Sequence, residues 1–316
     1  MSTPLDRRAL GRMLTRITNG DALELAMRSP LPAPQNPALR IGITGAPGAG
    51  KSTLLGQLAL ARLAKGRIGV LAVDPSSPRS GGAILGDRIR MDELDGSAEL
   101  YIRSLGSRGT SDGLADNLPE MLDGMDAFGF SEVLLETVGV GQTEYAARHQ
   151  VDTLVLLLLP ESGDTVQAMK AGIMEMADIF VVNKADLPGA QRIATDIQRI
   201  AAVTRHADGA WIPPVLLTAA SQPASILRLS EAIDRHQAWL GDGGRQQALR
   251  EQRARYRLRR VIEARVAAVI AQQDSGFFAL PMQQQMQHVA SLVGAGSTAV
   301  GAGARPVLAD GTLSGR

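Results

Sequence analysis

One stretch decides the fold, and it reads Gly45-Ala46-Pro47-Gly48-Ala49-Gly50-Lys51-Ser52. It matches the pattern G-x-x-x-x-G-K-[ST]. The apolar run Leu39–Thr44 before it predicts a strand, and the sequence from Thr53 to Lys65 after it predicts a helix. A glycine-rich turn would match the bare pattern equally well. The flanking strand and helix instead favour a phosphate-binding loop.

The chemistry of this loop follows from its residue types. Glycines allow successive backbone N–H groups to turn toward the phosphates of a nucleotide, and the N-terminus of the following helix adds its dipole. Lys51 would neutralise the β and γ phosphate oxygens, and the Ser52 hydroxyl would ligate Mg²⁺. The expected phosphate-binding residues are Gly45, Ala46, Pro47, Gly48, Ala49, Gly50, Lys51, Ser52 and Thr53.

Short apolar runs alternate with amphipathic stretches along the middle of the chain. This alternation predicts an α/β fold, a P-loop NTPase domain whose mostly parallel sheet is covered by helices on both faces. The runs expected to be strands are Leu39–Thr44, Ile68–Val73, Leu100–Ser104, Val133–Glu136, Leu154–Leu159, Ile179–Val182 and Val215–Thr218.

Helical extensions are expected at both ends of this domain, which we place at residues 39–241. Residues 1–38 form an N-terminal arm with helical spacing of its apolar residues, followed by a Pro-rich linker. Residues 245–293 form a C-terminal extension that begins with an Arg-rich helix, Arg245–Gln273. We interpret that helix as a solvated basic face over an apolar stripe that packs on the domain or on a second subunit. Residues 294–316 are rich in Gly, Ala and Ser and are expected to be disordered.

The composition excludes several classes of partner. A formal net charge of +1 over 316 residues gives no overall field that would attract nucleic acid or anionic lipid. The chain has no cysteine, so disulfides and thiolate metal sites are excluded. The apolar run Leu154–Leu159 is far too short to cross a bilayer. We expect a cytoplasmic protein that is neither secreted nor transmembrane and binds no nucleic acid.

A carboxylate is needed to hold the metal, and Glu136-Thr137-Val138-Gly139 lies at the end of a predicted strand. We assign Glu136 to the Walker B position, where Asp is usual, and expect Gly139 to offer its N–H to the γ-phosphate. Asp74 and Asp87 occupy positions where strand ends meet. Each is a candidate metal ligand or a helix cap or turn residue.

The motif Asn183-Lys184-Ala185-Asp186 follows another apolar run and predicts a guanine site. The Asp186 carboxylate accepts from the guanine N1–H and the exocyclic amine, whereas adenine offers no such pair of donors. Asn183 belongs to the same motif, and Lys184 would lie along the base. The stretch Thr218-Ala219-Ala220-Ser221 would supply a backbone N–H to guanine O6, which makes Ala219, Ala220 and Ser221 candidate ligands of GTP and GDP.

With these residues assigned, the sequence resembles the methylmalonyl-CoA mutase-associated GTPase family, formerly described as lysine/arginine/ornithine transport ATPases. The resemblance covers roughly residues 5 to 240. It rests on the four motifs Asp74-Pro75-Ser76-Ser77, Gly81-Gly82-Ala83-Ile84-Leu85-Gly86-Asp87, Ser107-Arg108-Gly109-Thr110 and Glu136-Thr137-Val138-Gly139-Val140-Gly141-Gln142.

This resemblance implies a GTPase chaperone of an adenosylcobalamin-dependent acyl-CoA mutase. Such proteins gate cofactor loading, protect the mutase from inactivation and form homodimers through C-terminal helices. The resemblance also places Asp74, Asp87 and Glu136 in the Mg²⁺ shell, together with Ser52. The segment Gly163-Asp164-Thr165-Val166-Gln167-Ala168-Met169-Lys170 would be an additional switch that communicates with the mutase.

Many regulatory GTPases place a Gln that orients the attacking water directly after the glycine of the Walker B motif, and this chain has no Gln there. Val140 stands in the place of the usual Gln, and a valine cannot hydrogen-bond water. We therefore expect slow intrinsic hydrolysis that the mutase accelerates. Gln142, Arg108 and Lys170 are candidates for the missing group, or else surface side chains. The expected catalytic residues are Lys51, Glu136, Gln142 and Lys170.

Two other functions suit the same domain. A metallochaperone-type NTPase would carry its metal on Cys and His side chains, and this chain has no cysteine. A transport-associated kinase would be expected to use ATP, against which the guanine-reading Asp186 argues.

Overall fold

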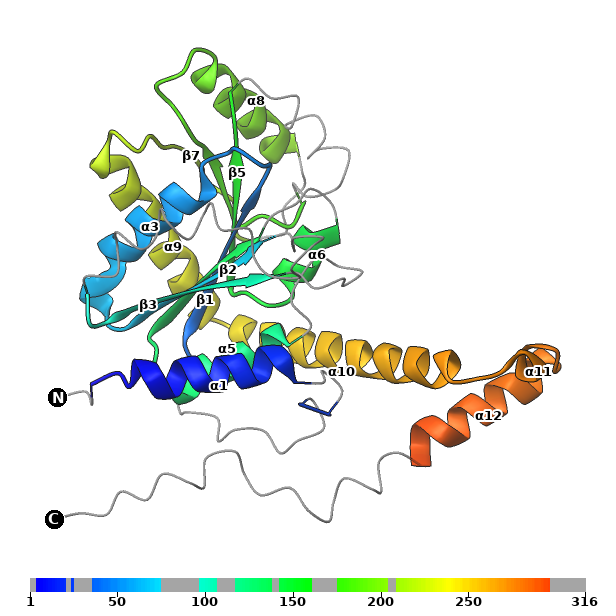
Figure 1. Cartoon of the computed structure of the whole chain (residues 1–316). Coiled ribbons are helices and arrows are strands. Elements are labelled where there is room, and N and C mark those ends of the chain that lie inside the picture. Colours follow the sequence, from blue (N-terminus) through cyan, green and yellow to red (C-terminus); the bar gives the residue numbers. More distant parts are fainter. Residues whose placement is uncertain are drawn as a thin grey trace, which may run out of the picture.

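The chain forms a single seven-stranded sheet in which every neighbouring pair of strands is parallel. The computed structural model describes residues 4–20, 24–25, 36–74, 97–106, 117–137, 142–160, 175–203 and 209–295. The strands lie in the order β3-β2-β4-β1-β5-β6-β7 (Figure 1). Their bounds are β1 Leu39–Gly45, β2 Ile68–Asp74, β3 Leu100–Gly106, β4 Glu132–Thr137, β5 Thr153–Leu158, β6 Ile179–Val182 and β7 Val215–Leu217.

All seven predicted strands are confirmed, with ends that differ by no more than about two residues. The predicted mostly parallel sheet is parallel throughout. This arrangement brings the carboxyl ends of all seven strands to one edge of the sheet, where open α/β sheets bind their ligands.

Helices cover both faces of the sheet, as predicted. On one face, α3 (Lys51–Arg62) and α9 (Pro223–Gly241) pack on the inner strands, and a 3₁₀ turn, η1 (Leu63–Lys65), follows α3. The opposite face carries α1 (Arg7–Asn19), α5 (Leu118–Ala127), α6 (Gln142–Arg148) and α8 (Ala190–Val203). The inner strands β4, β5 and β6 are buried along their whole length, which explains their continuous apolar runs. The edge strands β3 and β7 are mostly half-buried.

The N-terminal helix α1 is docked on the domain through its apolar stripe. Leu10, Met13, Leu14 and Ile17 are buried at helical spacing and join the core that contains α5. The helix ends at Asn19, and the backbone N–H of Gly20 closes its last turn by donating to the carbonyl oxygen of Ile17.

The C-terminal extension projects from the domain as α10 (Arg245–Ala271), α11 (Ser275–Phe278) and α12 (Met282–Ala295) (Figure 1). The interpretation of α10 as a basic solvated face needs correction. Arg253 pairs with the buried Asp152 of the domain. Arg257 pairs with Glu120 and with the partly exposed Asp123. Ile262 and Ile270 of the predicted apolar stripe are 47% and 39% exposed, whereas Val269 is buried.

Among the helices that the structure describes, none combines the length and the apolar character that a membrane crossing requires. The predicted tail from residue 296 onward lies outside the described residues.

Candidate functional site

The predicted phosphate loop connects the end of β1 to the start of α3, at the edge where the strands end. Gly48 and Gly50 have φ angles of 79° and 83°, a left-handed conformation that glycine adopts without strain. At Gly45 a Cβ atom would lie 2.3 Å from the carbonyl oxygen of Leu157 on β5. The glycines of the motif are therefore required by backbone conformation and by close packing.

Lys51 is the first residue of α3 and is only 5% exposed. Its Nζ donates to the carbonyl oxygens of Gly45 and Ala46, each at 3.0 Å. The ammonium group thus lies over the loop that carries the backbone N–H groups. A buried cation at the N-terminus of a helix is suited to neutralising a polyphosphate.

The Walker A serine and the proposed Walker B carboxylate meet directly. Ser52 Oγ donates to Glu136 Oε1 at 2.8 Å, although the residues are 84 positions apart in the sequence. Glu136 lies near the end of β4 and is 2% exposed. A hydroxyl beside a buried carboxylate is an all-oxygen donor set, the type that Mg²⁺ prefers.

The other predicted metal ligands are only partly described. Asp74 is the last residue of β2, and β2 pairs with β4 through Ala72–Glu136 and Val73–Thr137. Its backbone therefore lies at the same edge as Glu136, while its side chain and the whole of Asp87 fall outside the described residues. Within the described ranges no group of three or more His, Cys, Asp or Glu side chains is arranged to hold a metal ion.

Asn183 connects the predicted base site to the phosphate loop. Its Nδ2 donates to the carbonyl oxygen of Ala49 at 2.8 Å, and its Oδ1 accepts from Thr218 Oγ1 at 2.9 Å. A Cβ atom at Gly50 would lie 2.6 Å from Asn183 Nδ2, so the last glycine of the loop leaves room for this contact. The structural role of Asn183 and Thr218 was not predicted from the sequence, since a short motif does not reveal which loop its side chains reach.

The two base-binding segments lie side by side. Ala185 N donates to Thr218 O at 2.9 Å, which joins the segment after β6 to the segment after β7. Lys184 has a φ of 54°, an uncommon value for a residue with a side chain. Asp186, Ala220 and Ser221 are exposed at this edge, while Ala219 is buried.

Several predicted switch residues cannot be placed. Gln142 begins α6, but its side chain lies outside the described residues, as do Arg108, Lys170 and the segment 138–141.

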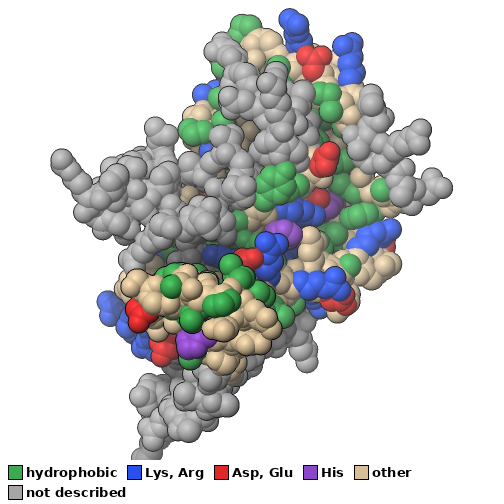
Figure 2. All heavy atoms as spheres, turned by 90° about the vertical axis from the view of Figure 1, so that its right-hand side faces the viewer, with side chains coloured by type: hydrophobic (Ala, Val, Ile, Leu, Met, Phe, Trp, Pro, Cys, Tyr) green, Lys and Arg blue, Asp and Glu red, His purple; other side chains and the backbone are tan. Residues whose placement is uncertain are grey.

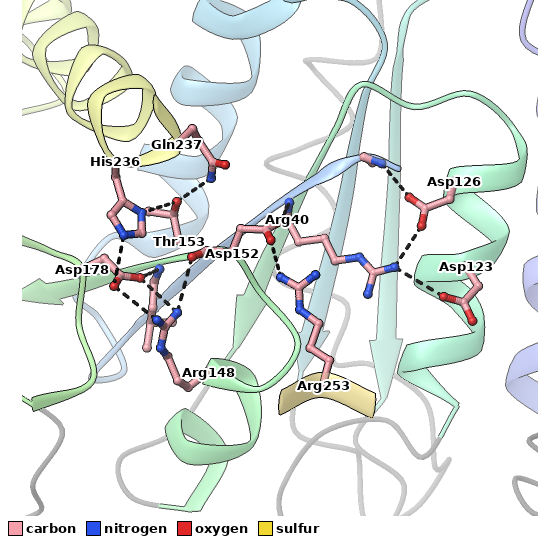
Figure 3. Close-up of polar contacts among 12 residues, drawn as sticks. Arg40, Asp123, Asp126, Arg148, Asp152, Thr153, Asp178, His236, Gln237 and Arg253 are labelled. Atoms are coloured by element: carbon pink, nitrogen blue, oxygen red, sulfur yellow. Dashed lines mark hydrogen bonds and ion pairs between the residues drawn. The ribbon is translucent and has the colours of Figure 1, made fainter. Parts of the chain in front are cut away.

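A second polar cluster occupies the opposite edge of the sheet, where the strands begin (Figure 3). Asp152, just before β5, accepts from Arg40 N at 2.7 Å and from Arg253 Nη2 of α10 at 2.5 Å. Arg40 also pairs with Asp126 of α5 at 2.9 Å. We call this set, together with the neighbours described next, the far-edge network. No motif in the sequence pointed to it.

The far-edge network also contains a buried pair of titratable groups. Burial raises the pKa of Asp178 to about 6, although Arg148 at 3.1 Å opposes the shift. Burial also lowers the pKa of His236 to about 4, and Arg148 adds to that effect. His236 Nε2 lies 3.4 Å from Asp178 Oδ1, and its Nδ1 is 2.8 Å from Thr153 Oγ1.

Comparison with known proteins places this geometry in a family. A family profile described as methylmalonyl Co-A mutase-associated GTPase MeaB matches residues 12–275. A protein of Pyrococcus abyssi named as a GTPase is 42% identical over 273 residues, which cover 84% of this chain and 82% of the relative. The GTPase ArgK of Escherichia coli is 36% identical over 232 residues, 72% of this chain and 70% of the relative.

A solved structure is similar along nearly the whole chain. The crystal structure of an LAO/AO transport system kinase has a TM-score of 0.62 and 25% sequence identity, and the match covers 92% of this chain and 100% of that one.

Proposed function

The chain belongs to the family of methylmalonyl-CoA mutase-associated GTPases, and from that membership we propose that it is the GTP-hydrolysing chaperone of an adenosylcobalamin-dependent acyl-CoA mutase. As a GTPase of this family it binds guanine nucleotide. In the proposed role, hydrolysis gates the loading of the cofactor onto the mutase and protects the mutase from inactivation. The observation that carries the GTPase chemistry is the contact of Ser52 with Glu136 above a glycine loop.

We assign the nucleotide to the edge where the strands end. The loop from Gly45 to Thr53 would hold the phosphates through backbone N–H groups, with Lys51 on the β and γ oxygens. Asp186 would read the guanine donors, while Asn183 holds the base segment against the loop. Replacing Asp186 with Asn should therefore shift preference toward xanthine nucleotides, whose C2 carbonyl takes the place of the guanine amine.

Mg²⁺ fits the residues that meet here. Ser52 and Glu136 would hold it, with Asp74 and Asp87 as further ligands, and all four offer oxygen. When bound, the ion neutralises the charge that develops on the β and γ phosphate oxygens. The chain itself then orients the γ-phosphate and holds the water that attacks it, a role for which Gln142 and Lys170 are the candidates. Attack on the γ-phosphorus breaks its bond to the bridging oxygen and releases GDP and phosphate.

The test of the chaperone function is single-turnover GTP hydrolysis with and without the mutase. We expect slow hydrolysis by the protein alone and an acceleration on the order of a hundredfold or more in the complex, since one added transition-state group can supply that much. Lys51→Ala serves as the inactive control. Equal rates with and without the mutase, together with binding that ignores the nucleotide, would contradict the proposed switch.

We also propose a homodimer that forms through the C-terminal extension. The end of the extension exposes Phe278, Met282 and Met286 by 54%, 69% and 67%. Figure 2 looks onto this end and shows hydrophobic side chains gathered on it. An apolar surface of this kind on a projecting helix pair is typical of an interface, and the same extension on a second copy offers a matching surface.

A pair of substitutions on α12 tests the dimer. Met282→Glu with Met286→Glu should give a monomer by sedimentation, because two charges would have to be buried. Gln283→Glu with Gln287→Glu adds the same charges to the same helix at exposed polar positions and should leave the dimer intact. A wild-type monomer at micromolar concentration would refute the proposed dimer.

A further inference from the structure

Successive residues of β4 point to opposite faces of the sheet. Leu134 packs in the core beneath α3, whereas Leu135 packs in the core beneath α5 and α6. By this alternation Glu136 faces α3, where it meets Ser52, and Thr137 faces the side that α6 covers. On β1 the same rule places Ile43 on the α3 side and Thr44 on the α6 side.

The strands β1 and β4 part at the level of the site. Their pairing runs from Leu39–Glu132 to Ile43–Glu136. Beyond that level β1 remains paired with β5 through Thr44–Leu156, and β4 remains paired with β2 through Val73–Thr137. In the described residues beyond this level, β1, which leads into the phosphate loop, is paired only with β5, and β4, which carries Glu136, is paired only with β2.

A side-chain hydrogen bond bridges the two strands where their backbone pairing ends. Thr137 Oγ1 donates to Thr44 Oγ1 at 3.0 Å, and both residues are fully buried. Neither hydroxyl was singled out by the sequence motifs. A buried hydroxyl is costly unless it is paired, so separating the two strands at this level would leave two buried hydroxyls without this partner.

We infer that Thr137 and Thr44 are positioning residues for GTP hydrolysis, an inference that rests on the proposed role of Glu136. Glu136 ties β4 to α3 on one face, and Thr137 ties it to β1 on the other. The carboxylate is thereby held at a set place relative to Ser52 and to the loop. Thr137 also fixes the start of the segment that leads to Gly139, the residue assigned to the γ-phosphate.

This role predicts a split between turnover and binding. Without the hydroxyl bond, β4 can shift against β1, which moves the groups that act on the γ-phosphate and the metal. The loop that holds the β-phosphate stays attached to β5 through the pairs Thr44–Leu156 and Gly45–Leu157, and the base contacts belong to other segments, so both should remain. GDP affinity should therefore change by about twofold at most, whereas kcat should fall about tenfold, the factor that one net hydrogen bond can supply.

The experiment compares Thr137→Val with Thr153→Val in full-length protein without the mutase, so that the outcome is independent of the proposed partner. Thr153 is also fully buried and hydrogen-bonded, to His236 and Gln237, but at the far edge of the sheet. Both variants should lose thermal stability. Only Thr137→Val should lower kcat and raise the Mg²⁺ concentration that gives half-maximal rate, and Thr137→Ser should restore both.

Thr44→Val removes the same bond from the other strand and covers the case in which Thr137→Val does not fold. The double variant should then be no slower than the slower single variant, because both changes remove one interaction. The inference is overturned if folded Thr137→Val or Thr44→Val keeps the wild-type kcat. It is equally overturned if GDP affinity falls as much as kcat, or if Thr153→Val slows turnover to the same extent.

Discussion

The two edges of the sheet are built in different ways. In the described residues, the edge where the strands end is built from the glycines and backbone groups of the loop, on which Lys51 donates to two carbonyl oxygens and beside which Glu136 accepts from Ser52. The edge where the strands begin is held by long charged side chains that reach across the domain. The first edge is suited to binding a ligand, whereas the charged side chains of the second edge pair with one another.

This difference predicts that substitutions at one edge lower turnover and substitutions at the other lower the free energy of unfolding. We propose that the edge where the strands end, here called the nucleotide edge, holds the phosphates, so removing a group there should affect turnover first. Groups in the far-edge network neutralise each other, so removing one leaves a buried charge behind and should affect folding first.

The largest effect is expected for Lys51→Ala. Loss of the cation at the phosphates should lower GTP turnover on the order of a thousandfold, or roughly 4 kcal/mol of transition-state stabilisation. The midpoint of thermal unfolding should change little, because the far-edge network is untouched. Single-turnover hydrolysis and calorimetry on the same sample measure both. A large loss of thermal stability together with near-normal turnover would contradict the proposed role of Lys51 at the phosphates.

Arg253→Ala should show the opposite behaviour. It leaves the Asp152 carboxylate buried with one partner fewer and should cost about 3 kcal/mol in the free energy of unfolding. Turnover of the folded protein should remain near the wild-type value. The control is Arg255→Ala, an exposed arginine of the same helix, which should change stability little. Equal losses in the two variants would show that α10 is not anchored through Asp152.

The smallest expected effect concerns pH and the pair Asp178 and His236. A raised carboxyl pKa means that the folded protein binds the proton first, so this group adds stability as the pH falls through 6. A lowered imidazole pKa means that the unfolded chain binds the proton first, so His236 subtracts stability over nearly the same range. Each contribution is on the order of 1 to 2 kcal/mol between pH 7 and pH 5, and the two oppose each other.

Substituting one member of the pair at a time should reveal the pH-dependent contribution of the other to the free energy of unfolding. Asp178→Asn should lose stability on acidification from pH 7 to pH 5 more steeply than wild type, whereas His236→Asn should lose less or gain. Denaturant unfolding at the two pH values provides the measurement. Parallel pH profiles for all three proteins would mean that the pair does not titrate in this window.

The sequence predicted the loop between β1 and α3 because its geometry demands particular residues at fixed spacing. Gly45 and Gly50 are required by a close approach and by a left-handed backbone, so their pattern is visible without a structure. The apolar runs of the inner strands were equally visible, because a strand that is buried on both faces shows no alternation of polar and apolar residues.

The far-edge network could not be predicted, since its members are ordinary charged residues that lie far apart in the chain. Arg40 and Asp152 are separated by 112 positions, and Arg253 lies 101 positions beyond Asp152. In a sequence, Arg253 looks the same as the exposed Arg255. Only the packing of α10 decides which arginines find buried carboxylates, and that packing is a property of the tertiary structure.

The ion pairs that attach α10 to the domain affect how far its free end can move. Arg253 and Arg257 fix the first half of the helix to the domain, whereas the rest of it extends outward to α11 and α12 (Figure 1). The 14 residues of α10 beyond Arg257 span about 21 Å at 1.5 Å per residue, so a tilt of about 5° at Arg257 displaces the end of the helix by about 2 Å. A small tilt of the free half of α10 therefore displaces α11 and α12 farther than it displaces any group near Arg257.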